Sequence, residues 1–155
     1  LLIIPSLYDR PNHPPEILWD PFADGLIAAC NPRMRIVEGN EFGYYIDSLN
    51  DFQEMYDYDY ATAATHCAVP HKFLKQLDVG FGLYLDRDGW GKDPELNASS
   101  ASWQIRVENA LRVADSYVWI FQNGPQWWSG RELPQAYIDA TFRALDLAER
   151  RRAAQ

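Results

Sequence analysis

Four short runs of apolar residues, rich in β-branched and aromatic side chains, recur along this chain of 155 residues. They span residues 1–6, 35–41, 79–86 and 117–122, and the stretches between them mostly have the residue spacing of helices. One more helix is expected after the fourth run. Repeated strand–helix units place their strands side by side and parallel, because a helical crossover returns the chain to the neighbouring position in the sheet. The sequence therefore predicts an α/β fold with a parallel (βα)4 sheet.

The third run gives the two faces of its strand different characters. The face that suits packing against helices carries four large apolar residues, Val79, Phe81, Leu83 and Leu85. The opposite face carries two glycines and two polar residues, Gly80, Gly82, Tyr84 and Asp86. Glycines on one face of a strand leave space for large neighbours or for a ligand.

Helix starts are marked by residues that cap helices or occupy their first turn. The expected helices begin near Asp20, Asn50, Ser102 and Pro134. Pro70 is expected to kink or interrupt the second of them, because proline lacks the amide hydrogen that a helix interior uses. No linker and no low-complexity tract divides the chain, so residues 1–155 are predicted to form a single domain.

Composition excludes several classes of partner. The net charge of −8 argues against binding to a nucleic-acid backbone or to an anionic membrane surface. No segment approaches the ~18 consecutive apolar residues that a membrane span needs, so a soluble piece is expected. Cys30 and Cys67 lack the spacing of metal ligands or redox pairs, and we interpret them as reduced structural thiols that leave the compartment undetermined.

The first residues begin inside an apolar strand, without an initiator methionine or a polar leader. We interpret the chain as part of a longer protein or as one product of a cut. A signal peptide fits less well, because the apolar run is short and no basic residues precede it.

Polar side chains follow the predicted strands at their carboxyl ends, where parallel sheets bind their ligands. Glu38, Asn40 and Glu41 follow the second strand, and Asp86 ends the third. A carboxylate in a cleft can act as a general acid, base or nucleophile, and a second carboxylate nearby separates their pKa values. We favour Glu41 and Asp86 as the catalytic pair, with Glu38 as the alternative partner. The competing interpretation is that one glutamate forms a cap or salt bridge and the other is solvated.

No metal and no cofactor are expected. A metal site would have to be assembled from four carboxylates at the strand ends, Glu38, Glu41, Asp86 and Asp88. The three histidines give it no support, since they fall in a proline-rich loop or on or near a helix, namely His13, His66 and His71.

Aromatic residues also gather on or just after the predicted strand ends, namely Tyr44, Tyr45, Trp90, Trp119, Trp127 and Trp128. Flat rings beside carboxylates are typical of sugar sites, because the C–H faces of a pyranose stack on them and its hydroxyls bind acids and amides. The predicted substrate-binding residues are Asn40, Tyr44, Trp90, Trp119, Trp127 and Trp128. For any single ring the alternative is that it fills the core. Trp127 and Trp128 are expected on the rim, because a Gly/Pro loop forms a core poorly.

Three segments carry a resemblance to a known family: residues 36–41 (IVEGNE), residues 81–86 (FGLYLD), and residues 117–121 (YVWIF) together with Trp127-Trp128. In these segments the chain resembles the C-terminal half of a (β/α)8-barrel glycoside hydrolase. The resemblance implies one half of a TIM barrel. Many members of that group place an acid/base glutamate directly after an asparagine at a strand end, which Asn40-Glu41 matches.

A half-barrel leaves two sheet edges and an apolar inner face uncovered, so we expect it to be completed by a partner chain. That partner is a second copy in a homodimer, or a complementary N-terminal half-barrel. The predicted function is carbohydrate hydrolysis or binding at the strand carboxyl ends, with activity weak or absent without a second half. One alternative is a noncatalytic structural or carbohydrate-binding scaffold that self-associates. Another is a doubly wound, flavodoxin-like domain that binds phosphate, which the lack of a glycine-rich loop after any strand disfavours.

Overall fold

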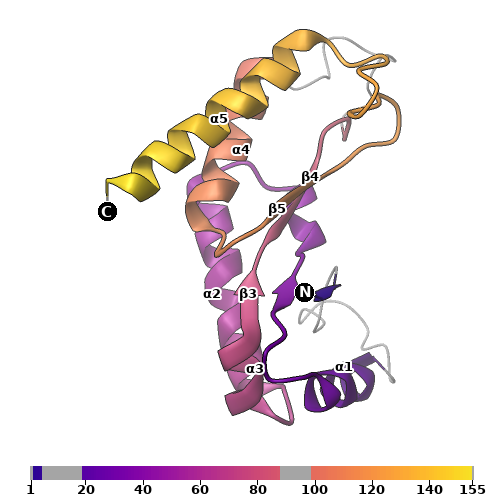
Figure 1. Ribbon diagram of the computed structural model, residues 1–155, viewed down its shortest axis with the longest axis vertical. Coiled ribbons are helices and arrows are strands. Elements are labelled where there is room, and N and C mark those ends of the chain that lie inside the picture. Colours follow the sequence, from indigo (N-terminus) through magenta and orange to yellow (C-terminus); the bar gives the residue numbers. More distant parts are fainter. Residues whose placement is uncertain (1, 5–18, 88–98, 155) are drawn as a thin grey trace.

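The computed structural model of the chain describes residues 2–4, 19–87 and 99–154 (Figure 1). Strands and helices alternate along this part of the chain, as the sequence predicts. In order they are β1 (Leu2–Ile4), α1 (Trp19–Ala29), β2 (Ile36–Glu38), the 3-10 helix η1 (Glu41–Tyr44), α2 (Leu49–Thr65), α3 (Pro70–Gln76), β3 (Leu77–Val79), β4 (Phe81–Tyr84), α4 (Ser100–Val113), β5 (Val118–Phe121) and α5 (Gln135–Ala153).

The strands are short and parallel, and they form two small sheets. The first sheet has the order β1-β2-β3, and the second pairs β4 with β5. The expected parallel α/β class is therefore confirmed. The described residues form two separate small sheets and no closed barrel, so the half of a TIM barrel stays a prediction.

The third predicted strand is two strands, because the chain is interrupted at Gly80. The Gly80 amide donates to the Glu38 carbonyl over 2.7 Å, which keeps this point of the chain beside β2. A Cβ atom at Gly80 would lie 2.7 Å from the Tyr117 carbonyl oxygen and 3.2 Å from a Val37 methyl group. Glycine is thus required where the neighbouring segments approach most closely.

α2 begins at Leu49, next to the expected start at Asn50. The helical stretch is interrupted before Pro70, as expected, whereas the cap of α4 differs from the prediction. The Ser48 hydroxyl accepts the Asp51 amide at the start of α2. Pro70 begins a helix of its own, because a proline in the first turn needs no amide partner. The expected cap Ser102 is wrong: Ser99 caps α4, and its hydroxyl accepts the Ser102 amide over 3.1 Å.

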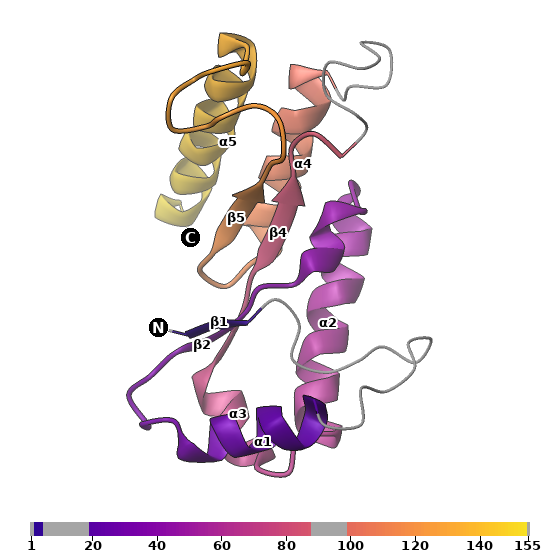
Figure 2. The ribbon, with the colours of Figure 1, turned by 90° about the vertical axis from the view of Figure 1, so that its right-hand side faces the viewer.

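The core lies between the helices and one face of the strands. Val79, Phe81, Leu83 and Leu85 are all buried in it, which confirms the expected packing face of the third run. The Phe52 ring of α2 meets the Phe81 ring edge-on, with centroids 5.0 Å apart. Figure 2 shows α4 and α5 together behind β4 and β5.

The opposite face of β4 and β5 has a different composition. A Cβ atom at Gly82 would lie 2.7 Å from the Trp119 ring and 2.8 Å from the Tyr44 ring, so aromatic side chains converge over this glycine. No described helix lies in front of β4 and β5 in Figure 2. None of the helices in the described ranges is long and apolar enough to span a membrane.

Candidate functional site

Four aromatic rings meet on the face of β4 and β5 that α4 and α5 do not cover. The Tyr44 ring centroid lies 5.5 Å from that of Tyr84, 5.5 Å from that of Trp119 and 5.6 Å from that of Phe121. We call Tyr44, Tyr84, Trp119 and Phe121 the aromatic cluster. It forms because Gly82 pairs with Trp119 and Tyr84 with Phe121 across the two strands, and Gly82 leaves room for rings. Phe121 is 38% exposed, and Tyr45, whose ring meets that of Tyr44 edge-on, is 68% exposed.

Asn40 lies beneath this cluster and is buried. Its backbone has a φ of 43°, a left-handed conformation that asparagine adopts more readily than most residues. The side-chain amide donates to an Asp59 carboxylate oxygen of α2 over 2.7 Å. Its carbonyl accepts the amides of Gly43 and Gly82, each over 3.1 Å. Asn40 therefore joins the end of β2 to η1, β4 and α2.

The end of β2 also holds Trp119 in place. The Trp119 indole N–H donates to the Gly39 carbonyl over 2.8 Å, so its ring has a defined position relative to the strand end. Trp119 is half-buried, which leaves part of its surface accessible.

Three carboxylates were predicted here, and they lie in different environments. Glu38 is buried, and its Oε1 accepts the Asn40 amide over 3.3 Å. Asp86 is buried, and it accepts the Asn123 amide over 3.0 Å and the Gly124 amide over 2.8 Å. Glu41 is exposed at the start of η1. Glu38 and Asp86 thus hold backbone turns, and Glu41 is the one of the three that meets solvent.

Glu41 acts electrostatically on the aromatic cluster. Burial raises the pKa of the Tyr44 hydroxyl well above its usual range, and the negative charge of Glu41 raises that pKa further. An exposed carboxylate and a ring of the cluster lie close enough to interact.

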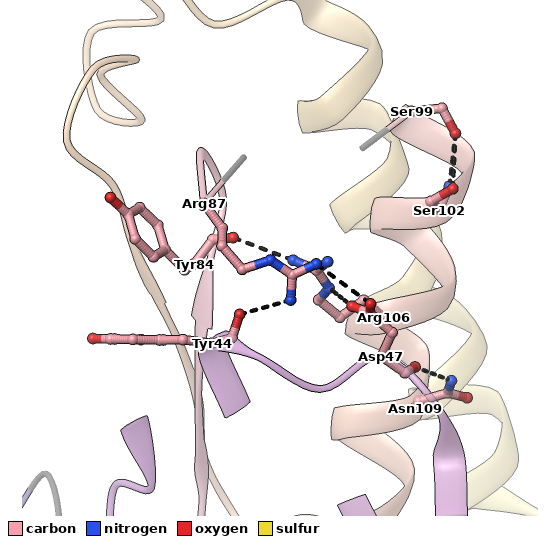
Figure 3. A network of polar contacts seen from close by, with 8 residues as sticks. All are labelled: Tyr44, Asp47, Tyr84, Arg87, Ser99, Ser102, Arg106 and Asn109. Atoms are coloured by element: carbon pink, nitrogen blue, oxygen red, sulfur yellow. Dashed lines mark hydrogen bonds and ion pairs between the residues drawn. The ribbon is translucent and has the colours of Figure 1, made fainter. Parts of the chain in front are cut away.

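Polar residues that the sequence did not indicate hold the cluster from behind (Figure 3). Arg87 donates to the Tyr44 carbonyl over 2.9 Å, and Arg106 donates to the Tyr84 carbonyl over 3.2 Å. Both arginines pair with Asp47, whose carbonyl accepts the Asn109 side-chain amide. In Figure 3 the Tyr44 and Tyr84 rings point away from these arginines, so the network fixes the backbones and leaves the rings on the other side.

One sequence signal could have identified this network. Arg106 falls among Trp103, Val107 and Ala110, which share the buried face of α4. A charged residue on a buried helix face requires a partner, because an unpaired buried charge is costly. Asp47 is that partner.

The remaining predicted aromatic residues lie apart from the cluster. Trp127 is half-buried against the hydrophobic core, whereas Trp128 is 96% exposed. Neither makes a ring contact with the aromatic cluster in the part of the chain that the structure describes. Trp90 lies outside the described residues.

The described ranges contain no group of three or more histidine, cysteine or acidic side chains that could hold a metal ion. His66 and His71 are exposed on α2 and α3 surfaces. Asp88 and His13 lie outside the described residues.

The chain was compared with known protein families, curated proteins and solved structures. The chain matches no protein-family model, no curated protein and no solved structure. The chemistry of the site is therefore argued from its own residues.

Proposed function

We propose that the aromatic cluster is the carbohydrate-binding face of a glycoside-hydrolase-like half-barrel. The observation that carries this proposal is the gathering of four rings from η1, β4 and β5 on the strand face that α4 and α5 leave uncovered. Partly exposed rings such as Phe121 and Trp119 offer flat apolar surfaces on which the C–H faces of a pyranose stack. Glu41, whose charge acts on Tyr44 of the same cluster, is an exposed acceptor for hydrogen bonds from sugar hydroxyls.

Sugar binding is favoured over hydrolysis, because two of the three predicted catalytic carboxylates are buried and already hydrogen-bonded. Glycosidases of the usual kind use two carboxyl groups on either side of the bond that breaks. Glu38 and Asp86 are buried and accept backbone amides, so Glu41 alone of the predicted three is accessible. Hydrolysis at Glu41 therefore requires a second carboxylate other than Glu38 and Asp86.

The test measures binding of soluble hexasaccharides of β-1,4-linked glucose, xylose and mannose by calorimetry. Replacing Phe121 or Tyr45 with alanine should weaken the binding of at least one sugar by about two- to tenfold, the range expected for one lost stacking contact. The matched control is Phe142→Ala, since Phe142 is 61% exposed on α5 and is not part of the cluster. No binding by the wild type, or an equal loss in the control, would reject the proposal.

A parallel assay separates binding from catalysis. The wild type and Glu41→Gln are incubated with aryl glycosides, and release of the phenol is measured. We expect no release from either protein alone. Hydrolysis by the wild type that Glu41→Gln abolishes would instead identify Glu41 as a catalytic residue and replace the binding proposal with an enzymatic one.

A second candidate function is self-association through the same face. β5 pairs only with β4 among the described strands. Tyr117, just before β5, and Phe121, its last residue, are both exposed. A second half-barrel would cover these side chains. Sedimentation velocity at low micromolar concentration should then give a dimer, which Phe121→Glu dissociates and Phe142→Glu does not. A folded wild-type monomer would contradict this candidate and leave sugar binding unaffected.

A further inference from the structure

A second site is suggested by an open hollow that none of the aromatic-cluster residues lines. It lies between the C-terminal turns of α4 and α5 and has a volume of about 570 Å³. Figures 1 and 2 show α4 and α5 running in the same direction, so these two turns lie at the same end of the helix pair. A volume of this size lies within the range of small-molecule sites, which is roughly 300–1,000 Å³.

Positive charge converges on the hollow from both helices. Its lining includes Arg112 from α4 and Arg151 and Arg152 from α5. Among the described residues, the side chains of Arg112 and Arg152 form no ion pair and no hydrogen bond. The Arg151 guanidinium lies 3.8 Å from a Glu108 carboxylate oxygen, at the outer limit of an ion pair. Two unpaired arginines and one weakly paired arginine in a chain with a net charge of −8 indicate a local anion site.

The helix dipole does not account for all three arginines. A basic residue near a helix C-terminus is favourable in itself. Arg150 provides such a charge on α5, and it pairs with Asp146 over 2.7 Å on the helix surface. Arg112, Arg151 and Arg152 instead share one hollow although they come from two helices.

The acidic residue of the lining is already satisfied. The Asp115 carboxylate accepts hydrogen bonds from the hydroxyls of Tyr56 (2.9 Å) and Tyr60 (2.8 Å), and from the Val79 amide (2.8 Å). These donors satisfy the carboxylate oxygens, and no described arginine forms an ion pair with Asp115. Leu111 and Ala148 supply an apolar wall beside the arginines.

We propose that this hollow binds the phosphate group of a small phosphate monoester. Guanidinium groups match the oxygens of phosphate with paired hydrogen bonds, and three of them suit a dianion. The apolar wall of Leu111 and Ala148 takes the organic part of the ligand. The strong negative charge of the rest of the chain disfavours an extended polyanion such as a nucleic acid.

The test is calorimetric titration of the whole chain with phenyl phosphate, with phenol as the uncharged comparison. We expect saturable binding of phenyl phosphate and none of phenol. Arg112→Gln and Arg152→Gln should each weaken binding by about tenfold or more, the loss expected when a hydrogen bond between charged groups is removed. Both arginines are exposed, so the melting temperature should stay close to that of the wild type.

The matched control is Arg150→Gln, which removes the same charge from the same turn of α5 but outside the hollow. Its affinity for phenyl phosphate should stay within about twofold of the wild type, because only screened long-range charge is lost. The proposal is overturned if phenyl phosphate does not bind saturably, or if Arg150→Gln weakens binding as much as Arg112→Gln and Arg152→Gln do.

Discussion

At the scale of single residues, the site depends on glycine at position 82, which has no side chain. The aromatic cluster closes over Gly82, where an added Cβ atom would lie 2.7 to 2.8 Å from the rings of Trp119 and Tyr44. Such rings cannot move aside separately, because they contact one another and Trp119 is tied to the Gly39 carbonyl. The space above Gly82 is therefore a requirement of the site and of its stability.

We expect Gly82→Ala to lower the free energy of unfolding by about 1–3 kcal/mol, the usual cost of overpacking a well-filled region. The control is Gly25→Ala in α1, where an added Cβ atom meets nothing within 4 Å. That change should raise stability by about 0.5–1 kcal/mol, because alanine loses less backbone entropy in a helix than glycine does. Urea unfolding measures both values, and equal effects of the two changes would contradict the packing argument.

In the sequence, Asp86 is compatible with either a catalytic role or a structural role. Its position at a strand end agrees with catalysis, yet its oxygens accept the amides of Asn123 and Gly124. Asp86→Asn should lower the free energy of unfolding by about 1.5–3 kcal/mol, because an amide NH2 group would face backbone donors. Asp57→Asn, an exposed position on α2, is the control and should change stability little. An Asp86→Asn protein as stable as the wild type would return Asp86 to the list of functional candidates.

At the scale of secondary-structure elements, the cap of α4 decides where the helix begins and hence where Arg106 faces. Ser99 provides the cap hydroxyl, and Ser102 provides the amide that binds it. The start of α4 sets the register in which Arg106 reaches Asp47 and the Tyr84 carbonyl. The start of α4 is thus linked, through Arg106, to the position of Tyr84, whose ring lies on the other side of β4.

We expect Ser99→Ala to cost about 1 kcal/mol of stability, the usual value of a helix cap, and Ser102→Ala to cost less. Alanine at position 102 keeps the backbone amide that Ser99 accepts, which makes Ser102→Ala the matched control. Thermal unfolding of the two variants at one pH gives the comparison. A larger loss for Ser102→Ala would show that the helix begins at a different residue.

At the scale of the whole molecule, half-buried tyrosines link distant parts of the chain. Tyr56 and Tyr60 of α2 share the Asp115 carboxylate, which lies between α4 and β5. Burial raises the pKa of Tyr60, and its hydrogen bonds to Asp115 and Tyr56 raise that pKa further. Burial raises the pKa of Tyr44 and Tyr137 as well. The native state therefore keeps these protons at a pH where an unfolded chain releases them.

The chain should consequently lose stability as the pH rises above about 10, the ordinary pKa of tyrosine in the unfolded chain. Below that pH both states hold the protons, so the stabilising contribution is fully present there. The free energy of unfolding in urea, measured at intervals between about pH 8 and pH 11, checks this direction. Tyr60→Phe should flatten the decline, because one of the linked protons is removed. Stability that stays constant across this range would contradict the raised pKa values.

The sequence by itself determined the alternation of strands and helices, the parallel direction of the strands and the packing face of Val79, Phe81, Leu83 and Leu85. These features follow from residue spacing. Apolar residues recur every two positions in a half-buried strand and about every 3.6 positions in a helix, so the sequence alone reveals both patterns. It also placed Glu41 just after β2 and Asp86 just after β4, at the carboxyl ends of their strands.

Only the tertiary structure decided which polar groups are engaged and which meet solvent. Asn40 and Asp86 are as polar in sequence as Glu41, yet Asn40 is buried against the Asp59 carboxylate and Asp86 against the Asn123 amide, both from distant segments. The same holds for Arg112 and Arg152, which converge on one hollow although they lie forty positions apart in the sequence. Such contacts depend on how separate elements dock, and residue spacing along one element carries no information about the partner on another.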